Sequence, residues 1–149
     1  MGVCVTEVLR PAPRFLRAFA ARLRDSDARE ILGATGTPRA AVAVHLAREI
    51  SGAVSGGGRV WAVTDGTRPL ALFGARPDSL TADAATVWML ATGDADAMPL
   101  QFGRWSRRCL DMVFRAFPDV SAFHNYVPER SERTVAWLRW LGAWLSVPD

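Results

Sequence analysis

An apolar run, a long amphipathic segment and a second apolar run follow one another late in the chain, and this order constrains the fold most. The first run, Thr86–Thr92, ends at Gly93. It is too short for a typical helix, so it predicts a strand buried on both faces and central in a sheet. The pattern then predicts a helix over 102–117 and a strand over 120–127. Since such crossovers are right-handed and join parallel strands, we expect these two strands to be adjacent and parallel.

A hairpin is predicted just before this crossover unit. The apolar runs 60–63 and 70–73 flank the dipeptide Asp65-Gly66, which is a strong turn signal between antiparallel strands. A sheet that holds both this hairpin and the parallel pair has to be mixed.

The N-terminal part reads as one strand followed by helices. Residues 3–9 alternate as a strand does, and an amphipathic helix is predicted from Pro13. Asp27 and Glu30 have the spacing of a capping box, which predicts a second, short helix. The alternative is that both carboxylates face an amine substrate. A third helix is predicted from Pro38.

The C-terminal part is predicted as a helix over 131–141 that ends at Gly142, followed by a last strand over 143–147. The whole pattern indicates the α/β (α+β) class, with a mixed central sheet flanked by helices. The 149 residues are expected to form a single domain spanning 1–149.

Composition excludes several kinds of function. All 18 basic residues are arginine, so Schiff-base chemistry on a lysine is excluded. The net charge of +3 is modest and the arginines are scattered, so no nucleic-acid partner is expected. The two cysteines and two histidines lack the spacing of a zinc site. No run approaches the roughly 20 apolar residues of a membrane span, so no membrane partner is expected either.

Four stretches of sequence carry a resemblance to a known family: LRDSDAREI at 23–31, PLALFG at 69–74, WMLAT at 88–92 and AWLRWLG at 136–142. In these stretches and in its order of elements, the chain resembles the GNAT superfamily of N-acetyltransferases. It is most similar to the small GNAT-like internal virion proteins of short-tailed phages. The resemblance spans nearly the whole chain and implies a GNAT-like mixed sheet flanked by helices.

The resemblance also implies a cofactor, acetyl-CoA, and an amine substrate. GNAT enzymes hold the pantetheine arm against the exposed edge of the central strand, where that strand diverges from its parallel neighbour. They hold the pyrophosphate at the start of the next helix, where unpaired amides and the helix dipole favour an anion. The matching positions here are Leu90, Ala91, Thr92 and Gly93 on the strand, and Gln101, Gly103 and Arg104 near the helix start.

His124 and Tyr126 are the candidate catalytic residues. They lie two residues apart on the predicted strand and therefore on one face of it. A histidine of ordinary pKa can take a proton from an amine, and a tyrosine can protonate a departing thiolate. The alternative is that His124 is a structural histidine and that Tyr126 anchors packing.

Two departures from the family pattern leave a second function open. The segment Gln101–Arg104 does not reproduce the family's phosphate-loop pattern, and Leu138 stands where the family has its usual tyrosine acid. The chain is thus predicted to be a GNAT-fold acyl-CoA-dependent N-acetyltransferase of phage or prophage origin, with weak or lost activity. The alternative is a non-catalytic internal virion or assembly protein whose partners are other virion proteins. The expected location is the host cytoplasm or the virion.

Overall fold

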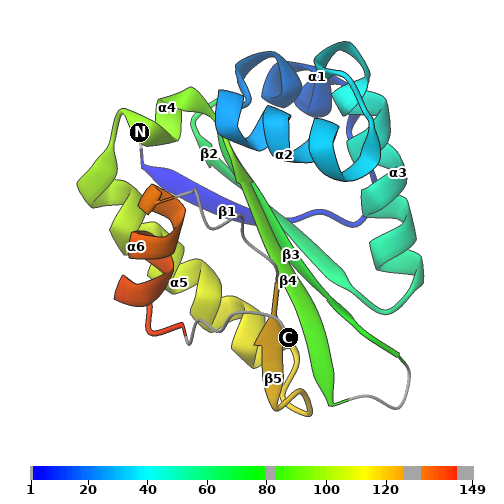
Figure 1. Cartoon of the computed structure of the whole chain (residues 1–149), viewed down its shortest axis with the longest axis vertical. Coiled ribbons are helices and arrows are strands. Elements are labelled where there is room, and N and C mark those ends of the chain that lie inside the picture. Colours follow the sequence, from blue (N-terminus) through cyan, green and yellow to red (C-terminus); the bar gives the residue numbers. More distant parts are fainter. Residues whose placement is uncertain (1, 80–82, 126–131, 144–149) are drawn as a thin grey trace.

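The computed structural model describes residues 2–79, 83–125 and 132–143 (Figure 1). In chain order the elements are β1 (Val3–Glu7), α1 (Pro13–Arg22), α2 (Asp25–Thr35), the 3-10 helix η1 (Arg39–Ala41), α3 (Val42–Ser55), β2 (Arg59–Asp65), β3 (Arg68–Pro77), β4 (Ala84–Ala91), α4 (Gly93–Asp96), α5 (Pro99–Ala116), β5 (Ala122–His124) and α6 (Glu132–Trp140). The strands form one sheet in the order β1-β2-β3-β4-β5.

The sheet is mixed, as predicted. Neighbouring strands from β1 to β4 are antiparallel, whereas β4 and β5 are parallel and adjacent. The predicted hairpin joins β2 to β3, with Asp65 paired to Arg68 across the turn. Gly66 adopts a φ of 63° there, a conformation that glycine adopts without steric cost.

The central strand is β3, so the prediction that the 86–92 run is central is wrong. Every residue from Leu70 to Ala75 is buried, whereas most of β4 is only half-buried. The reason is that β5, within the described residues, pairs with only Ala84–Thr86 of β4. The rest of β4 lacks a partner strand on that side among the described residues.

Helices cover both faces of the sheet (Figure 1). One core joins α1, α2 and α3 to the face that carries Val60, Ala62 and Leu72. The other core joins α4 and α5 to the face that carries Trp61 and Phe73, whose rings stack at 5.1 Å. Burial of apolar side chains on two faces is the main driving force for such a layered fold.

Gly74 of β3 is required by the packing of its neighbour on β4. A Cβ atom at this position would lie 2.7 Å from the carbonyl oxygen of Arg59 and 2.9 Å from the Trp88 ring. Gly74 and Trp88 are register partners, so the indole lies across the glycine. The absence of a side chain at Gly74 therefore positions Trp88.

The predicted helices are present, but the capping box is not. Helix α2 starts after Arg24, and no side-chain hydrogen bond caps it. Asp27 instead points to β4, as described below. Helix α6 ends before Gly142, which has a φ of 95° as expected for a C-terminal glycine. The predicted last strand lies outside the described residues except for residue 143.

No helix in the described part of the chain is both long enough and apolar enough to cross a membrane.

Candidate functional site

The parallel strands β4 and β5 diverge after a short paired stretch. Their register ends at Thr86 and His124, and the side-chain amide of Asn125 then donates to the carbonyl oxygen of Val87 at 2.7 Å. Backbone groups alternate along a strand, so those of Val87, Met89 and Ala91 point to the β5 side. Beyond Val87, β4 therefore presents an edge to which no described strand is paired.

The far end of this edge is closed by the junction between α1 and α2. The buried carboxylate of Asp27 accepts a hydrogen bond from the amide of Ala91 at 2.9 Å. The amide of Arg24 donates to the carbonyl oxygen of Ala91 at 3.0 Å, and Leu23 forms a bridge with Thr92. Both backbone groups of Ala91 are thus engaged, and those of Met89 remain on the open stretch of the edge.

This arrangement corrects one expectation about the strand. The amides of Leu90 and Thr92 point to β3, and the amide of Ala91 points to the β5 side but is already engaged. Ala91 donates to Asp27, Thr92 donates to the carbonyl oxygen of Leu70 at 2.9 Å, and Leu90 is directed to β3 by its register. The residue whose amide faces the opening is Met89, since strand alternation gives every second residue to each side.

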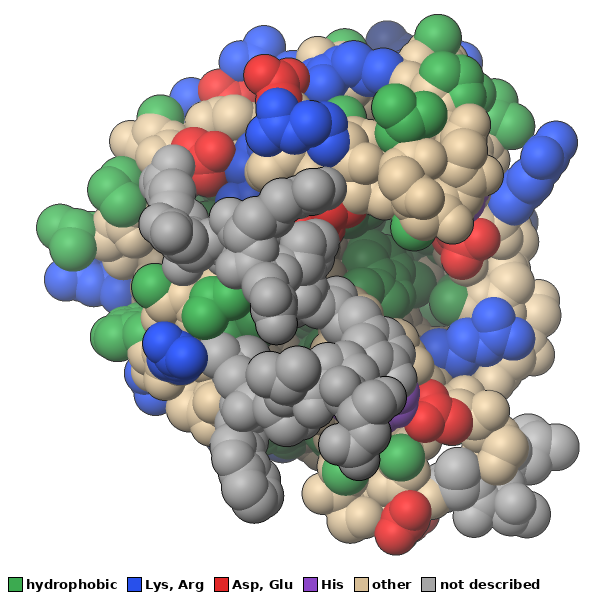
Figure 2. Space-filling view, viewed as in Figure 1, with side chains coloured by type: hydrophobic (Ala, Val, Ile, Leu, Met, Phe, Trp, Pro, Cys, Tyr) green, Lys and Arg blue, Asp and Glu red, His purple; other side chains and the backbone are tan. Residues whose placement is uncertain are grey.

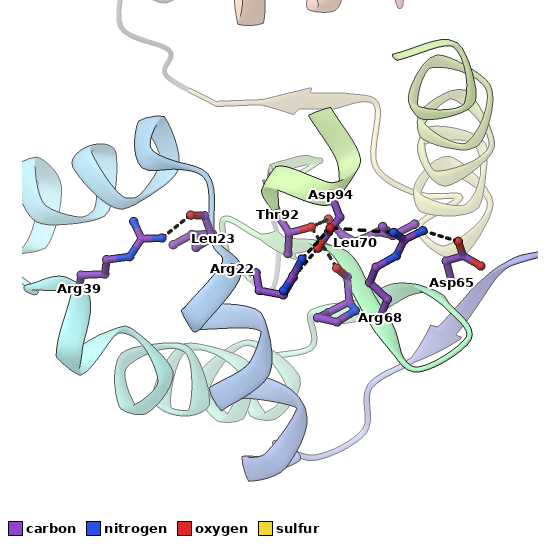
Figure 3. Close-up of polar contacts among 9 residues, drawn as sticks. Arg22, Leu23, Arg39, Asp65, Arg68, Leu70, Thr92 and Asp94 are labelled. Atoms are coloured by element: carbon purple, nitrogen blue, oxygen red, sulfur yellow. Dashed lines mark hydrogen bonds and ion pairs between the residues drawn. The ribbon is translucent and has the colours of Figure 1, made fainter. Parts of the chain in front are cut away.

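An acidic turn follows β4 and is held by arginines from other elements (Figure 3). Asp94 of α4 accepts two hydrogen bonds from Arg22, one of them at 2.8 Å, and lies 4.0 Å from Arg68. Asp96 accepts one from Arg24 at 3.3 Å. The hydrogen bond from Arg22 lowers the pKa of Asp94, so this carboxylate is anionic at neutral pH. The turn therefore places two carboxylates between the end of β4 and the start of α5, the helix start at which the resemblance places a pyrophosphate.

The start of α5 brings only some of the predicted binding residues to the surface. Gln101 and Arg104 are exposed, and no side-chain hydrogen bond or ion pair joins either of them to another described residue. Gly103 instead faces α6, where a Cβ atom would lie 3.4 Å from the Trp140 ring. Gly93 begins α4, which separates these residues from the end of β4.

His124 lies at the other end of the open edge and has a partner. Its Nε2 is 2.7 Å from a carboxylate oxygen of Asp78, which also accepts a hydrogen bond from Thr86 at 3.0 Å. The hydrogen bond from His124 lowers the pKa of Asp78. At a rise of about 3.3 Å per residue, Thr86 lies about 10 Å from Met89 along β4. Tyr126 lies outside the described residues.

A hollow with a hydrophobic floor opens on the helical face beside β4 (Figure 2). On this face β4 presents Trp88 and Leu90, which are half-buried and pack against the core formed with α1, α2 and α3. Burial raises the pKa of the Glu30 carboxyl on α2, and the charge of Asp27 raises it further, although Arg24 opposes them.

The sequence alone did not predict the roles of Asp27, Asp94 and Met89. The capping-box spacing accounted for Asp27 locally, and only contact with a strand 64 residues later reveals its function. For Asp94 the sequence contained one indication, namely that acidic residues directly follow the apolar run, where they would repel a phosphate. Among residues 2–79, 83–125 and 132–143, no group of three metal-ligating side chains is placed to hold a metal ion.

The sequence itself matches no protein-family model and no curated protein. Solved structures, in contrast, share its fold. A spermidine N-acetyltransferase chimera of Vibrio cholerae SpeG and hSSAT has a TM-score of 0.63 and 11% identity, with 95% of this chain and 80% of that chain covered. A possible acetyltransferase from Clostridium difficile has a TM-score of 0.63 and 9% identity, with 99% and 93% covered.

Glucosamine-6-phosphate N-acetyltransferase from Arabidopsis thaliana has a TM-score of 0.59 and 6% identity, with 100% of this chain and 96% of that chain covered. The TM-scores establish a common architecture. At identities this low they do not establish a common chemistry, which has to be argued from the site itself. Within the described residues, this chain itself has a mixed sheet, helices on both faces of that sheet and the diverging parallel pair β4–β5. The chain therefore has the fold of the GNAT N-acetyltransferases.

Proposed function

We propose that this chain is an acyl-CoA-dependent N-acyltransferase of low activity, which binds its donor at Met89 and transfers the acyl group to an amine. The observation that supports the proposal is the stretch of the β4 edge beyond Val87, to which no strand is paired within residues 2–79, 83–125 and 132–143 and on which the backbone of Met89 points to the β5 side. An amide on such an edge can donate to a carbonyl oxygen of a bound thioester arm, as in β-strand addition.

The proposed reaction needs one proton acceptor and a polarised carbonyl. An ammonium first gives one proton to a base, and the neutral amine then attacks the thioester carbon. The C–N bond forms as the C–S bond breaks. One nitrogen proton ends on the thiol that leaves, and the amide product keeps the other. The Met89 amide would stabilise negative charge on the carbonyl oxygen during this step.

The other predicted site residues have the following roles in this proposal. Leu90 to Gly93 would line the donor's path, and Gln101 and Arg104 are exposed near the helix start, where a phosphate would lie. His124 is the register partner of Thr86, which lies about 10 Å from Met89 along β4, so its proposed proton transfer requires more than one intervening water. Tyr126 stays the proposed proton donor to the thiolate.

Low activity follows from contacts that compete with the donor. Asp27 and Arg24 are hydrogen-bonded to the two backbone groups of Ala91. The pantetheine arm of the donor therefore cannot bond to these groups as well. Asp94 and Asp96 place negative charge near the proposed phosphate position. Like charges raise the free energy of a bound phosphate, although Arg22 and Arg24 partly neutralise them.

Calorimetric titration with acetyl-CoA tests the proposal. We expect saturable but weak binding. Met89→Pro removes the amide that faces the opening and should weaken binding at least about tenfold, the equivalent of one lost hydrogen bond. Met89→Ala is the matched control, since it removes the same side chain and keeps the amide, and should bind as the wild type does. Absence of wild-type binding at millimolar acetyl-CoA would overturn the proposal.

A second candidate function is a non-catalytic virion or assembly protein of phage or prophage origin. The engaged backbone of Ala91 and the acidic turn favour it, because both hinder a CoA donor. In that case the GNAT fold acts as a scaffold, and the partners are other virion proteins. Phage particles purified through a density gradient should then contain this polypeptide. Its absence from such particles would count against this alternative.

A further inference from the structure

The outer face of α5 carries four exposed arginines, namely Arg104, Arg107, Arg108 and Arg115. Successive helical residues are about 100° apart, so these four positions fall within an arc of about 100° around the helix axis. The one acidic residue of this helix, Asp111, lies in the same arc. Arginines that look scattered in the sequence are therefore gathered on one face by the helical repeat.

This face accounts for the whole formal net charge of the chain. The chain has 18 basic and 15 acidic residues, which gives +3. Four arginines and one aspartate give α5 the same value, so the other 14 arginines are balanced by 14 acidic residues elsewhere. Within the part of the chain that the structure describes, no carboxylate forms an ion pair with Arg104, Arg108 or Arg115. A modest net charge is therefore compatible with one strongly basic face that is open to an external anion.

Two aromatic rings border these arginines. Trp140 lies on α6, which packs against α5, and is 54% exposed, and Phe114 of α5 is 45% exposed (Figure 1). The Arg107 guanidinium lies 4.4 Å from the centre of the Trp140 ring and donates to the carbonyl oxygen of Trp140 at 3.1 Å. Phe114 packs against Phe123 of β5, with ring centroids 5.2 Å apart. Since Phe114 lies only about 20° from Arg107 around the helix axis, both rings follow the same border of the arginine face.

Cations beside exposed aromatic rings match the chemistry of unpaired nucleotides. Arginine binds phosphate through charge-assisted hydrogen bonds, and an exposed aromatic ring can stack on an unpaired base. An acidic peptide would pair with the arginines and leave the two rings without a matching partner. An anionic membrane would bury a continuous apolar face, whereas here arginines occupy the centre of the face and the rings its border.

We propose that the outer face of α5, together with Trp140 of α6, binds single-stranded nucleic acid. The arginines bind the phosphates, and Trp140 and Phe114 stack on bases. This binding is separate from the acyl transfer proposed above. Because Arg104 is also proposed for the phosphate of the donor, the test uses Arg108 and Arg115, which lie about 6 Å and 17 Å further along the helix.

Fluorescence anisotropy of a labelled oligothymidylate of about 12 nucleotides, titrated with the full chain, tests the proposal. We expect saturable binding that weakens as salt rises, since each phosphate contact releases counterions. The double variant Arg108→Gln/Arg115→Gln should bind at least about tenfold more weakly at low salt. Its plot of log K against log salt should be less steep by about 1.4, because each contact to a single strand contributes about 0.7 to the slope.

The stacking part of the proposal has its own probe and variants. An abasic oligomer of the same length keeps the phosphates and lacks the bases, so it should bind at least about tenfold more weakly than the oligothymidylate. Trp140→Ala should weaken oligothymidylate binding at least about fivefold and leave binding of the abasic oligomer unchanged. Trp140→Phe keeps an aromatic ring and should restore most of the affinity, which a merely structural role would not predict.

The matched control for the arginines is Arg14→Gln/Arg17→Gln. Both residues are exposed on α1, at the other face of the sheet, and their loss lowers the net charge equally. This variant should bind nearly as the wild type does. Equal weakening by the two double variants would overturn the proposal, because net charge alone would then explain the binding.

Three further results would overturn the proposal. The first is the absence of saturable binding by the wild type at low salt. The second is equal affinity for the oligothymidylate and the abasic oligomer, which would leave only a general attraction to polyanions. The third is binding to phosphatidylglycerol vesicles without binding to the oligothymidylate, which would assign the face to a membrane surface. Since no acetyl-CoA is present, each result is independent of the proposed transfer reaction.

Discussion

The buried carboxylate of Asp27 accepts a hydrogen bond of 2.9 Å from the amide of Ala91, 64 residues later in the chain. It also pairs with Arg24 through contacts of 3.0 and 3.2 Å. One side chain thereby fixes the start of α2 on the edge of β4 and limits the length of that edge that is open to a ligand.

Replacement of Asp27 by alanine should lower the free energy of unfolding by about 3 kcal/mol, because it leaves the buried Ala91 amide without its partner and leaves the partly buried Arg24 guanidinium with Asp96 alone. Urea unfolding followed by circular dichroism measures this value. The control is Asp25→Ala, whose carboxylate is 85% exposed and, among the residues that the structure describes, pairs with Arg39 alone. It should change stability by less than about 0.5 kcal/mol. Similar losses for both variants would mean that the Ala91 contact contributes little.

Gly74→Ala should destabilise the fold by about 2 kcal/mol, since the added methyl group would overlap a backbone oxygen and the Trp88 ring. The matched comparison is Gly52→Ala on α3. A Cβ atom there meets nothing within 4 Å, so alanine should stabilise the helix by about 0.5–1 kcal/mol. Thermal unfolding of the two variants should shift in opposite directions. A stable Gly74→Ala protein would show that Trp88 can move aside.

The two cysteines should differ in reactivity. Cys4 is exposed, whereas burial raises the pKa of the Cys109 thiol to about 12, so Cys109 stays protonated at any ordinary pH. We expect iodoacetamide at pH 8 to modify Cys4 alone in the native protein and both residues in denaturant, as measured by intact mass. Rapid native modification of Cys109 would indicate that α5 opens readily from the sheet.

Asp94→Asn should strengthen acetyl-CoA binding several-fold at low ionic strength, if a phosphate approaches the acidic turn as proposed. The variant removes a negative charge and releases Arg22 and Arg68 for a phosphate. The gain should shrink in 0.5 M salt, because exposed charges are screened there. Asp111→Asn alters net charge equally and should have little effect. Unchanged affinity in Asp94→Asn would place the phosphate elsewhere.

Local patterns predicted much of the architecture. The dipeptide Asp65-Gly66 predicted the β2–β3 hairpin, and the strand–helix–strand order predicted the parallel pair β4–β5. These features follow from turn geometry and from the handedness of crossovers, which depend on neighbouring residues. Local patterns also predicted where α6 ends, since glycine adopts a positive φ after a helix.

The residues that form the candidate site, and their environments, depend on the tertiary structure. Two residues with capping-box spacing, Asp27 and Glu30, proved to have different environments because α2 rests on the edge of β4. The strand that local hydrophobicity marked as central lies beside the centre, since β5 pairs with only three of its residues within the described part. Sequence periodicity reports which residues are buried, whereas backbone pairing and side-chain partners depend on segments far away in the chain. The Met89 amide lies on a stretch of β4 to which no strand in the described part of the chain is paired, and this is a property of the assembled sheet that no local pattern contains.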